Sequence, residues 1–145
     1  MTVALLRRLR CDSRAAAAVE FGILAPVFFA MLFGVLQVGI QMWNYNSLRS
    51  IAADTGRYTM VEYQKQNALS TDQIASKAIA LAVNAPYEFN IDRLGYPDVQ
   101  NPATDITGMK KFTVTLTYTP MGVLDFFGIT SPSLTVTRPI YVTET

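Results

Sequence analysis

One continuous apolar run dominates the pattern of hydrophobic and polar positions. Residues 21–40 read FGILAPVFFAMLFGVLQVGI, in which 15 of 20 residues are apolar, and no charge occurs from Phe21 to Leu48. A helix of 20 residues rises about 30 Å, which is the thickness of the hydrocarbon core of a bilayer. The run therefore predicts a transmembrane helix. The alternative is a buried core helix, which a chain of 145 residues could hardly surround.

After this run, apolar residues recur at three- and four-residue steps, which indicates helix. The first such stretch, from Asn44 to about Tyr63, continues the transmembrane helix. A second helix begins at the capping-box sequence of residues 70–73 and ends at residues 84–86, which read Asn-Ala-Pro. We expect the apolar stripe of this second helix to be a packing face rather than a ligand site. The two stripes are Leu48, Ile51, Ala52, Thr55 and Tyr58, and Ile74, Ala75, Ala78, Leu81 and Ala82.

From Tyr87 onward the period changes to two, which indicates strands. Residues 87–91 are expected to form a short strand, and turns follow at residues 95–98 and 101–102. Residues 111–119 alternate between apolar residues and threonines, as in an antiparallel strand with one buried face. Leu134, Val136, Ile140 and Val142 mark a last strand. Because Pro139 has no backbone donor, this strand is expected at a sheet edge or at a bulge.

These elements predict an α+β fold in three parts: a basic leader at residues 1–15, a transmembrane or assembly helix at residues 16–43, and an exported domain at residues 44–145. The domain is expected to hold one or two helices and a small antiparallel sheet of two to four strands. An apolar loop at residues 123–132 either tucks under the sheet or meets a partner protein. Its apolar residues are Leu124, Phe126, Phe127 and Ile129.

The flanks of the apolar run predict its orientation. Four arginines lie in the 20 residues before the run, whereas Arg49 and Arg57 are the first two basic residues after it. Basic flanks favour the cytoplasmic side, so the N-terminus is expected inside and the domain outside the cytoplasm. Trp43 and Tyr45 follow the run, where an interfacial aromatic belt is expected. The run is longer than the h-region of a secretory signal, and its far end is a poor cleavage site.

Composition argues against several classes of function. Histidine is absent and Cys11 is the one cysteine, so the sequence offers no histidine-based triad, no disulfide within the chain and no histidine metal site. A net charge of +1 gives no basic excess for nucleic acid. Asp92, Asp98 and Asp105 are spaced too loosely for a calcium loop. We therefore expect no enzyme, no cofactor and no metal, although an exported ligand-binding protein stays an alternative.

Glu20 is the most informative residue, because a charge within a membrane helix is costly and marks a functional hypothesis. The alternative is that Glu20 reaches the cytoplasmic interface. A cut between Ala15 and Ala16 would make Glu20 the fifth residue of the new chain, one helical turn from a free α-amino group. In a helical bundle, the carboxylate of one subunit could neutralise the amine of its neighbour and reward correct axial register. A cut at Gly22 would instead place Val27 fifth.

With this N-terminus the chain resembles a type IV prepilin, and more closely a TadE-like pseudopilin, a minor pilin of tight-adherence (Flp) pilus systems. The resemblance rests on Arg14 and Ala15, the small residues 16–18, the sequence Val19-Glu20-Phe21, Pro26 and Phe33-Gly34. Ala15 departs from the family pattern, which usually has Gly at this position. The Thr/Val-rich strands around the apolar loop also resemble the C-terminal layout of the family.

The resemblance implies a structural role. A prepilin peptidase would cut between Ala15 and Ala16, and Glu20 with Phe21 would set the assembly register. The expected partners are membrane lipid, the major Flp pilin, another minor pilin and the inner-membrane assembly platform. Close helix packing is expected at the small residues of the pairs Ala18/Gly22 and Ala30/Gly34 and at Pro26, with lipid-facing filler as the alternative for the pairs. An uncleaved, signal-anchored accessory subunit of an envelope complex is the alternative function.

Overall fold

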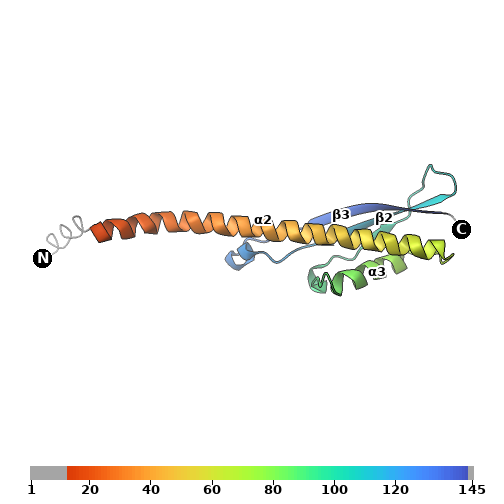
Figure 1. Ribbon diagram of the computed structural model, residues 1–145, viewed down its shortest axis with the longest axis horizontal. Helices are drawn as coiled ribbons and strands as arrows, with labels where there is room; N and C mark the ends of the chain where they lie inside the picture. The colour runs from red at the N-terminus through yellow and green to blue at the C-terminus, as the bar shows by residue number, and fades with distance from the viewer. Residues whose placement is uncertain (1–12, 144–145) are drawn as a thin grey trace.

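A single long helix runs through most of the molecule. In this computed structural model, which describes residues 13–143 except the side chains of residues 13–15 and 127, α2 extends over Ser13–Gln64, a length of 52 residues. At 1.5 Å per residue, α2 is about 78 Å long. Figure 1 shows the N-terminal end of α2 standing apart from the rest of the chain, a blue loop lying beside the middle of the helix, and the second half of the helix lying along a small sheet. The predicted continuation of the membrane helix beyond Asn44 is confirmed.

The second helix, α3 (Thr71–Val83), is capped as predicted. Gln73 donates its backbone N–H to the Ser70 hydroxyl at 3.2 Å, and Ser70 donates its own N–H to the Gln73 side chain at 2.8 Å. These two bonds satisfy donors that a free helix end would leave open. The predicted stripe faces the core: Ile74, Ala75, Ala78 and Ala82 are buried, and Leu81 is half-buried.

Three antiparallel strands form one sheet in the order β1-β2-β3. Their bounds are Asp98–Gln100 for β1, Met109–Tyr118 for β2 and Leu134–Thr143 for β3. Two short 3₁₀ helices, η1 (Ile91–Arg93) and η2 (Val123–Phe127), lie in the connections. Pro139 lies on β3, an edge strand of the sheet, and pairs with Thr113 of β2. The predicted edge position is therefore confirmed.

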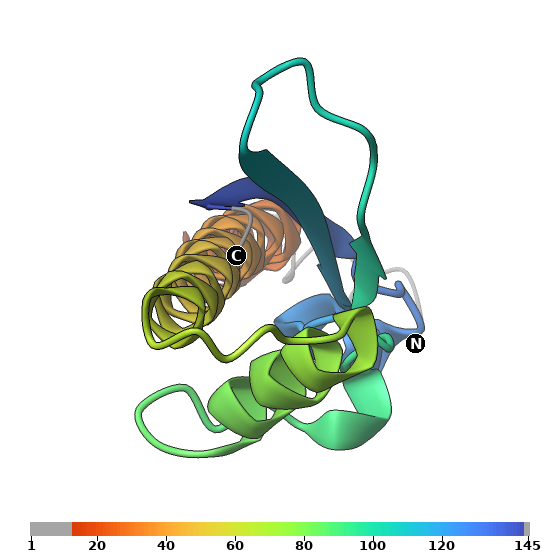
Figure 2. The same cartoon turned by 90° about the vertical axis from the view of Figure 1, so that its right-hand side faces the viewer.

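The domain has two layers, because α2 and α3 cover the same face of the sheet (Figure 2). The apolar residues of β2 alternate with threonines as predicted, and Phe112, Val114, Leu116 and Tyr118 are all buried against the helices. On the other face, cross-strand threonines approach one another, with 3.1 Å between the hydroxyls of Thr115 and Thr137. The α+β class is therefore confirmed.

The predicted strand at residues 87–91 is wrong. Phe89 donates its N–H to the Ala82 carbonyl at 2.8 Å, which turns the chain back on the end of α3. Its ring stacks on Tyr118, with 4.2 Å between centroids. The apolar residues here serve to insert one aromatic ring into the core. The first strand instead begins at Asp98, at the end of a segment that the sequence predicted as a turn.

The apolar loop lies neither under the sheet nor apart from the molecule. Its 3₁₀ helix, η2, packs beside α2, on the N-terminal side of the sheet (Figure 1). Of the two predicted alternatives, the one in which the loop tucks under the sheet is therefore wrong, and contact with a partner protein stays a prediction. The physical reason is that α2 and α3 already cover the buried face of the sheet, whereas the N-terminal half of α2 has exposed apolar side chains on which the loop can pack.

Candidate assembly helix and the loop clamped to it

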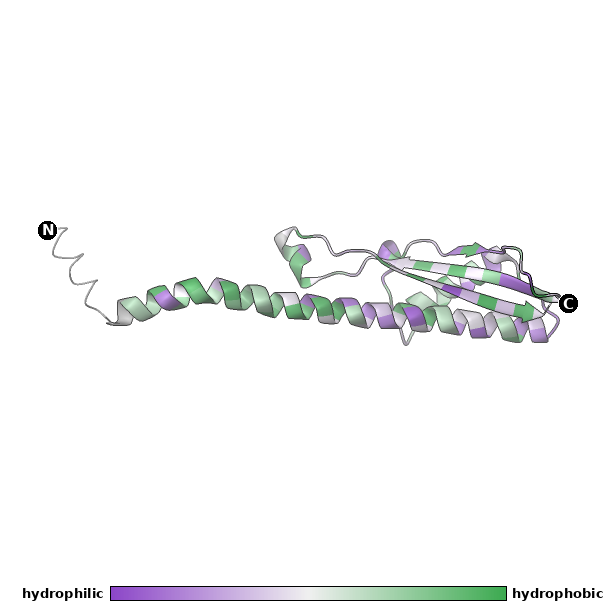
Figure 3. Ribbon diagram, turned by 90° about the horizontal axis from the view of Figure 1, so that it is seen from above, coloured by the Kyte–Doolittle hydropathy of each residue, from purple (hydrophilic) through white to green (hydrophobic). Residues whose placement is uncertain are grey.

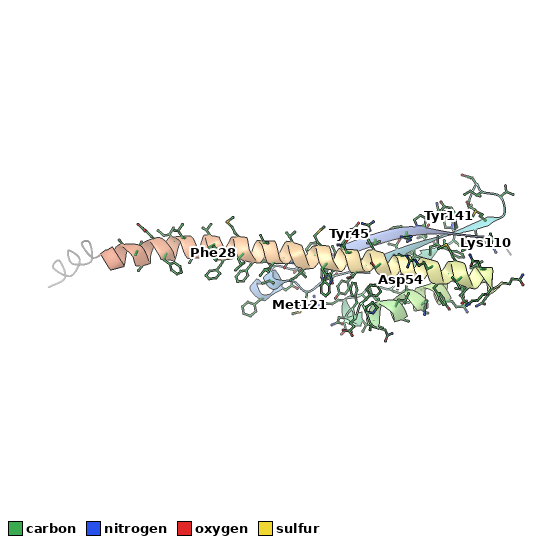
Figure 4. All side chains as sticks on the ribbon, viewed as in Figure 1. Phe28, Tyr45, Asp54, Lys110, Met121 and Tyr141 are labelled. Carbon is green, nitrogen blue, oxygen red and sulfur yellow. The ribbon has the colours of Figure 1, made fainter. Side chains whose placement is uncertain are left out.

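The first half of α2 exposes apolar side chains on all sides. Between Val19 and Trp43, the large hydrophobic residues that are exposed have 41–71% of their surface accessible. Figure 3 shows this hydrophobic stretch along the helix, and Figure 4 shows its side chains, including Phe28, standing out into open space. Such a surface is unfavourable in water at roughly 25 cal/mol per Å² of apolar area. It calls for an apolar surrounding, either lipid or other helices.

One helix of the described residues is long and apolar enough to cross a membrane, judged by length and composition. Only 6% of its most apolar 18-residue stretch is buried inside the structure. A core helix of a water-soluble domain would be mostly buried, so that alternative does not describe this chain. The segment is a single-pass membrane anchor or a signal sequence.

Glu20 and Phe21 lie near the start of this exposed surface. Both side chains are exposed, and no hydrogen bond or ion pair joins Glu20 to another residue within 13–143. Ala16 lies one turn before Glu20 on the same helix, and the bond between Ala15 and Ala16 is in the first turn of α2. The carboxylate is therefore available to a group outside the described chain.

The small residues singled out from the sequence follow one another along α2 at steps of four. Ala18, Gly22 and Ala30 are exposed, and a methyl group placed on Gly22 or Gly34 would meet nothing within 4 Å. This surface leaves room for the backbone of another helix to approach closely. Pro26 and Ala30 also face η2, since both line a groove between the helix and the loop.

A polar contact fixes the loop to the helix at Gln37. The Gln37 side chain is buried, and its Nε2 donates to the Ser131 hydroxyl at 2.8 Å. Its Oε1 accepts the N–H of Leu124 at 3.5 Å. A buried amide with neither contact would destabilise the packing by about 1–3 kcal/mol, so these bonds favour the docked loop. We call this contact, with Asp125 and Gly122 described next, the loop clamp.

Asp125 organises the loop side of the clamp. Its carboxylate accepts the N–H of Gly122 at 3.1 Å, the N–H of Ser131 at 2.9 Å and the Ser131 hydroxyl at 3.0 Å. Nη1 of Arg93 lies 3.7 Å from Oδ2 of Asp125. The hydrogen bond from Gly122, helped by those from Ser131 and by the Arg93 charge, holds the pKa of Asp125 below its ordinary value. The loop is thus closed on itself by one ionised side chain.

Gly122 is required where the loop meets the helix. A Cβ at this position would overlap the Gln37 amide and the Ser131 hydroxyl, so only glycine allows the contact. The sequence analysis did not single out Gln37, Gly122, Asp125 or Ser131 as site residues. A signal existed, because Gln37 is the one non-glycine, non-proline interruption of the apolar run and Asp125 is the only charge in residues 121–133.

The polar residues of the domain do not gather into a reaction centre. No group of three or more Cys, Asp or Glu residues within the described range could hold a metal ion. Asp92, Asp98 and Asp105 are exposed. The Tyr87 hydroxyl donates a hydrogen bond to Oδ2 of Asp54 at 2.8 Å. Burial is the main cause that raises the pKa of Tyr87, and this hydrogen bond raises it further. That contact ties the turn after α3 to α2, which is a structural role.

The fold and this surface describe an α+β protein whose apolar N-terminal helix is long enough to cross a membrane and continues into the domain core. Residues 15–57 match the family model described as TadE-like protein. Over these 43 residues the chain is similar to TadE-like proteins, and the resemblance expected from the sequence is confirmed for this segment. The matched segment includes Glu20, Phe21, Pro26 and the start of the buried half of α2. No curated protein and no solved structure matches the chain.

Proposed function

We propose that this chain is the precursor of a minor pilin that takes part in assembly of a tight-adherence pilus. The observation that carries the proposal is the exposed apolar half of α2, with Glu20 one turn after Ala16, inside the segment that matches TadE-like proteins. In this role the protein is structural and catalyses no reaction. Its helix first lies in the membrane and then packs among the helices of other pilin subunits.

Processing would begin the sequence of events. A prepilin peptidase of the inner membrane cuts between Ala15 and Ala16, and the basic leader stays in the cytoplasm. The rest of the chain keeps a single-pass arrangement, with its domain in the periplasm or outside the cell. The loop clamp supports an anchor over a discarded signal, because Gln37 in the apolar run is bound to the folded domain through Ser131.

Glu20 would then set the axial register. In the apolar surroundings of a helix bundle, its carboxylate pairs with the new α-amino group of a neighbouring subunit, either the major Flp pilin or a second minor pilin. A subunit displaced along the axis would leave both charges without a partner, which is strongly unfavourable in low dielectric. The exposure of Glu20 and its lack of a partner within residues 13–143 support this role.

The N-terminus of the mature protein tests processing. Mass spectrometry of protein extracted from membranes of cells that possess the peptidase should find Ala16 first. Ala15→Leu, which puts a bulky side chain at the cut, should leave the leader attached. Intact Met1 on the unaltered protein would overturn the proposal and favour the alternative, an uncleaved accessory subunit of an envelope complex.

Assembly is tested with Glu20→Ala and Glu20→Gln in cells that carry no other copy of the gene. Both variants should insert in the membrane with a folded domain but reduce the number of pili, since neither can neutralise an amine. Asp105→Ala, which removes an exposed carboxylate from the domain, is the matched control and should leave piliation unchanged. Normal piliation with either Glu20 variant would exclude the register role.

A further inference from the structure

The loop from Met121 to Ile129 presents apolar side chains outward. Phe126 is 90% exposed, Met121 68% and Ile129 57%, whereas the one charged residue, Asp125, is turned inward to the loop clamp. Loops that face water normally expose polar residues instead. We propose that this loop is inserted into the lipid leaflet on the domain side of the membrane that α2 crosses, and that lipid acyl chains fill the groove between loop and helix.

The position of the loop along α2 places it below the membrane surface. Trp43 is 71% exposed on α2, where an interfacial aromatic residue is expected. The groove is lined from α2 by residues between Pro26 and Phe33, which lie about 15–25 Å further along the helix toward its N-terminus. This distance exceeds the width of an interfacial region, so the residues of the groove lie at the depth of the hydrocarbon core.

The chemistry of the groove suits acyl chains rather than water. It has a volume of about 400 Å³, and its lining residues are all apolar: Pro26, Phe29, Ala30 and Phe33 from α2, and Leu124 and Ile129 from the loop. A water molecule is held in a pocket by two to four polar partners, which these side chains do not supply. Flexible hydrocarbon chains fill such an open groove without losing hydrogen bonds.

The polar side chains at the end of the loop nearest the sheet are paired within the protein. Asp125 accepts three hydrogen bonds and lies near Arg93, and Gln37 binds both Ser131 and Leu124. Gln37 lies about 9 Å along α2 from Trp43, between the aromatic residue and the groove. Polar and apolar residues of the loop therefore lie at different depths. The loop clamp lies toward the membrane surface, and Phe126 and Ile129 lie toward the bilayer interior.

This proposal requires α2 to lie in a membrane but does not require a pilus. It can therefore fail while the proposed function stands, and the reverse is also true. Two other occupants of the loop surface are conceivable, namely water and the helix of a second copy. Each gives a different result in purified protein that is reconstituted in vesicles.

The experiment uses the single tryptophan of the chain as a depth marker. The full chain and the double variant Trp43→Phe, Phe126→Trp are placed in phosphatidylethanolamine–phosphatidylglycerol vesicles with lipids brominated at shallow or deep acyl positions. The indole at position 126 should emit at shorter wavelength than an exposed indole and be quenched most by the deep bromines. Native Trp43 should be quenched most by the shallow ones.

Controls keep the result interpretable. Trp43→Phe, Tyr96→Trp puts the indole at a domain position whose side chain is 69% exposed, and it should emit as in water without quenching. If Phe126→Trp disturbs folding by circular dichroism, Ile129→Trp replaces it. Emission from position 126 as in water, with no bromine quenching, would overturn the proposal. So would a shift to shorter wavelength that appears only at high protein density, because the occupant would then be a second copy.

Discussion

The two halves of α2 use the same kinds of residue for opposite purposes. Ile23 in the first half is 67% exposed, whereas Ile51 in the second half is completely buried against the sheet and α3. In the second half the buried residues recur on one face, as in a helix that packs on a domain. In the first half apolar residues occur on every face, which only an apolar surrounding can satisfy. The same helix therefore needs lipid or other helices around its first half, whereas the domain core surrounds the buried face of its second half.

The largest expected effect comes from making the same Ile→Ala change once in each of these two environments. Ile51→Ala removes buried volume from the core and should lower the free energy of unfolding of the domain by about 2–5 kcal/mol. Ile23→Ala removes the same atoms where nothing of the domain packs, and should leave that free energy unchanged. Chemical denaturation in detergent micelles, followed by near-ultraviolet circular dichroism, measures both. Equal losses in the two variants would mean that the first half also belongs to the domain core.

The loop clamp is the one place within the described chain where polar groups tie the first half of α2 to the domain. Gly122→Ala should displace the Gln37 amide and the Ser131 hydroxyl, with a loss of about 1–3 kcal/mol in loop docking. Hydrogen exchange of residues 121–133 should become faster while the core stays protected. Gly39→Ala, on an open helix face, is the control. Unchanged exchange in Gly122→Ala would show that the clamp does not hold the loop.

The smallest expected effect is a weakening of loop docking at low pH. Because the folded state lowers the pKa of Asp125, the contribution of this carboxylate to loop docking is complete above the ordinary aspartate pKa. It is lost as the pH falls through the lowered value. In protein extracted into detergent, where no bilayer covers the loop, cleavage of the loop by an acid-active protease should therefore increase below that range. Asp125→Asn should remove this step, and an unchanged step in that variant would assign the titration to another group.

The sequence was sufficient for the elements with a strong period. The charge-free run, the capping box at Ser70 and the alternation of β2 each come from local rules of hydrogen bonding and burial, and the structure has all three. The edge position of β3 followed from Pro139, since the missing donor has the same consequence in any sheet.

What could not be predicted depends on contacts between distant residues. Phe89 is apolar whether it lies in a strand or inserts from a turn, and the position of Tyr118 decides between these outcomes. The loop clamp joins Gln37 to Ser131, 94 residues apart in the sequence. No local pattern relates them, although an amide in an apolar run indicates that a partner exists. The site residues at the N-terminus remain predictions, because their partners lie outside the chain.

The unbroken course of α2 has a mechanical consequence. A helix of 52 residues with no loop in it behaves as a stiff rod, so a force applied to the domain is carried along the helix toward Glu20. Pro26 is the only proline in this rod, and its missing N–H makes it the softest point. Tension on the outer part of the molecule would therefore be transmitted along some 78 Å and concentrate its bending near Pro26.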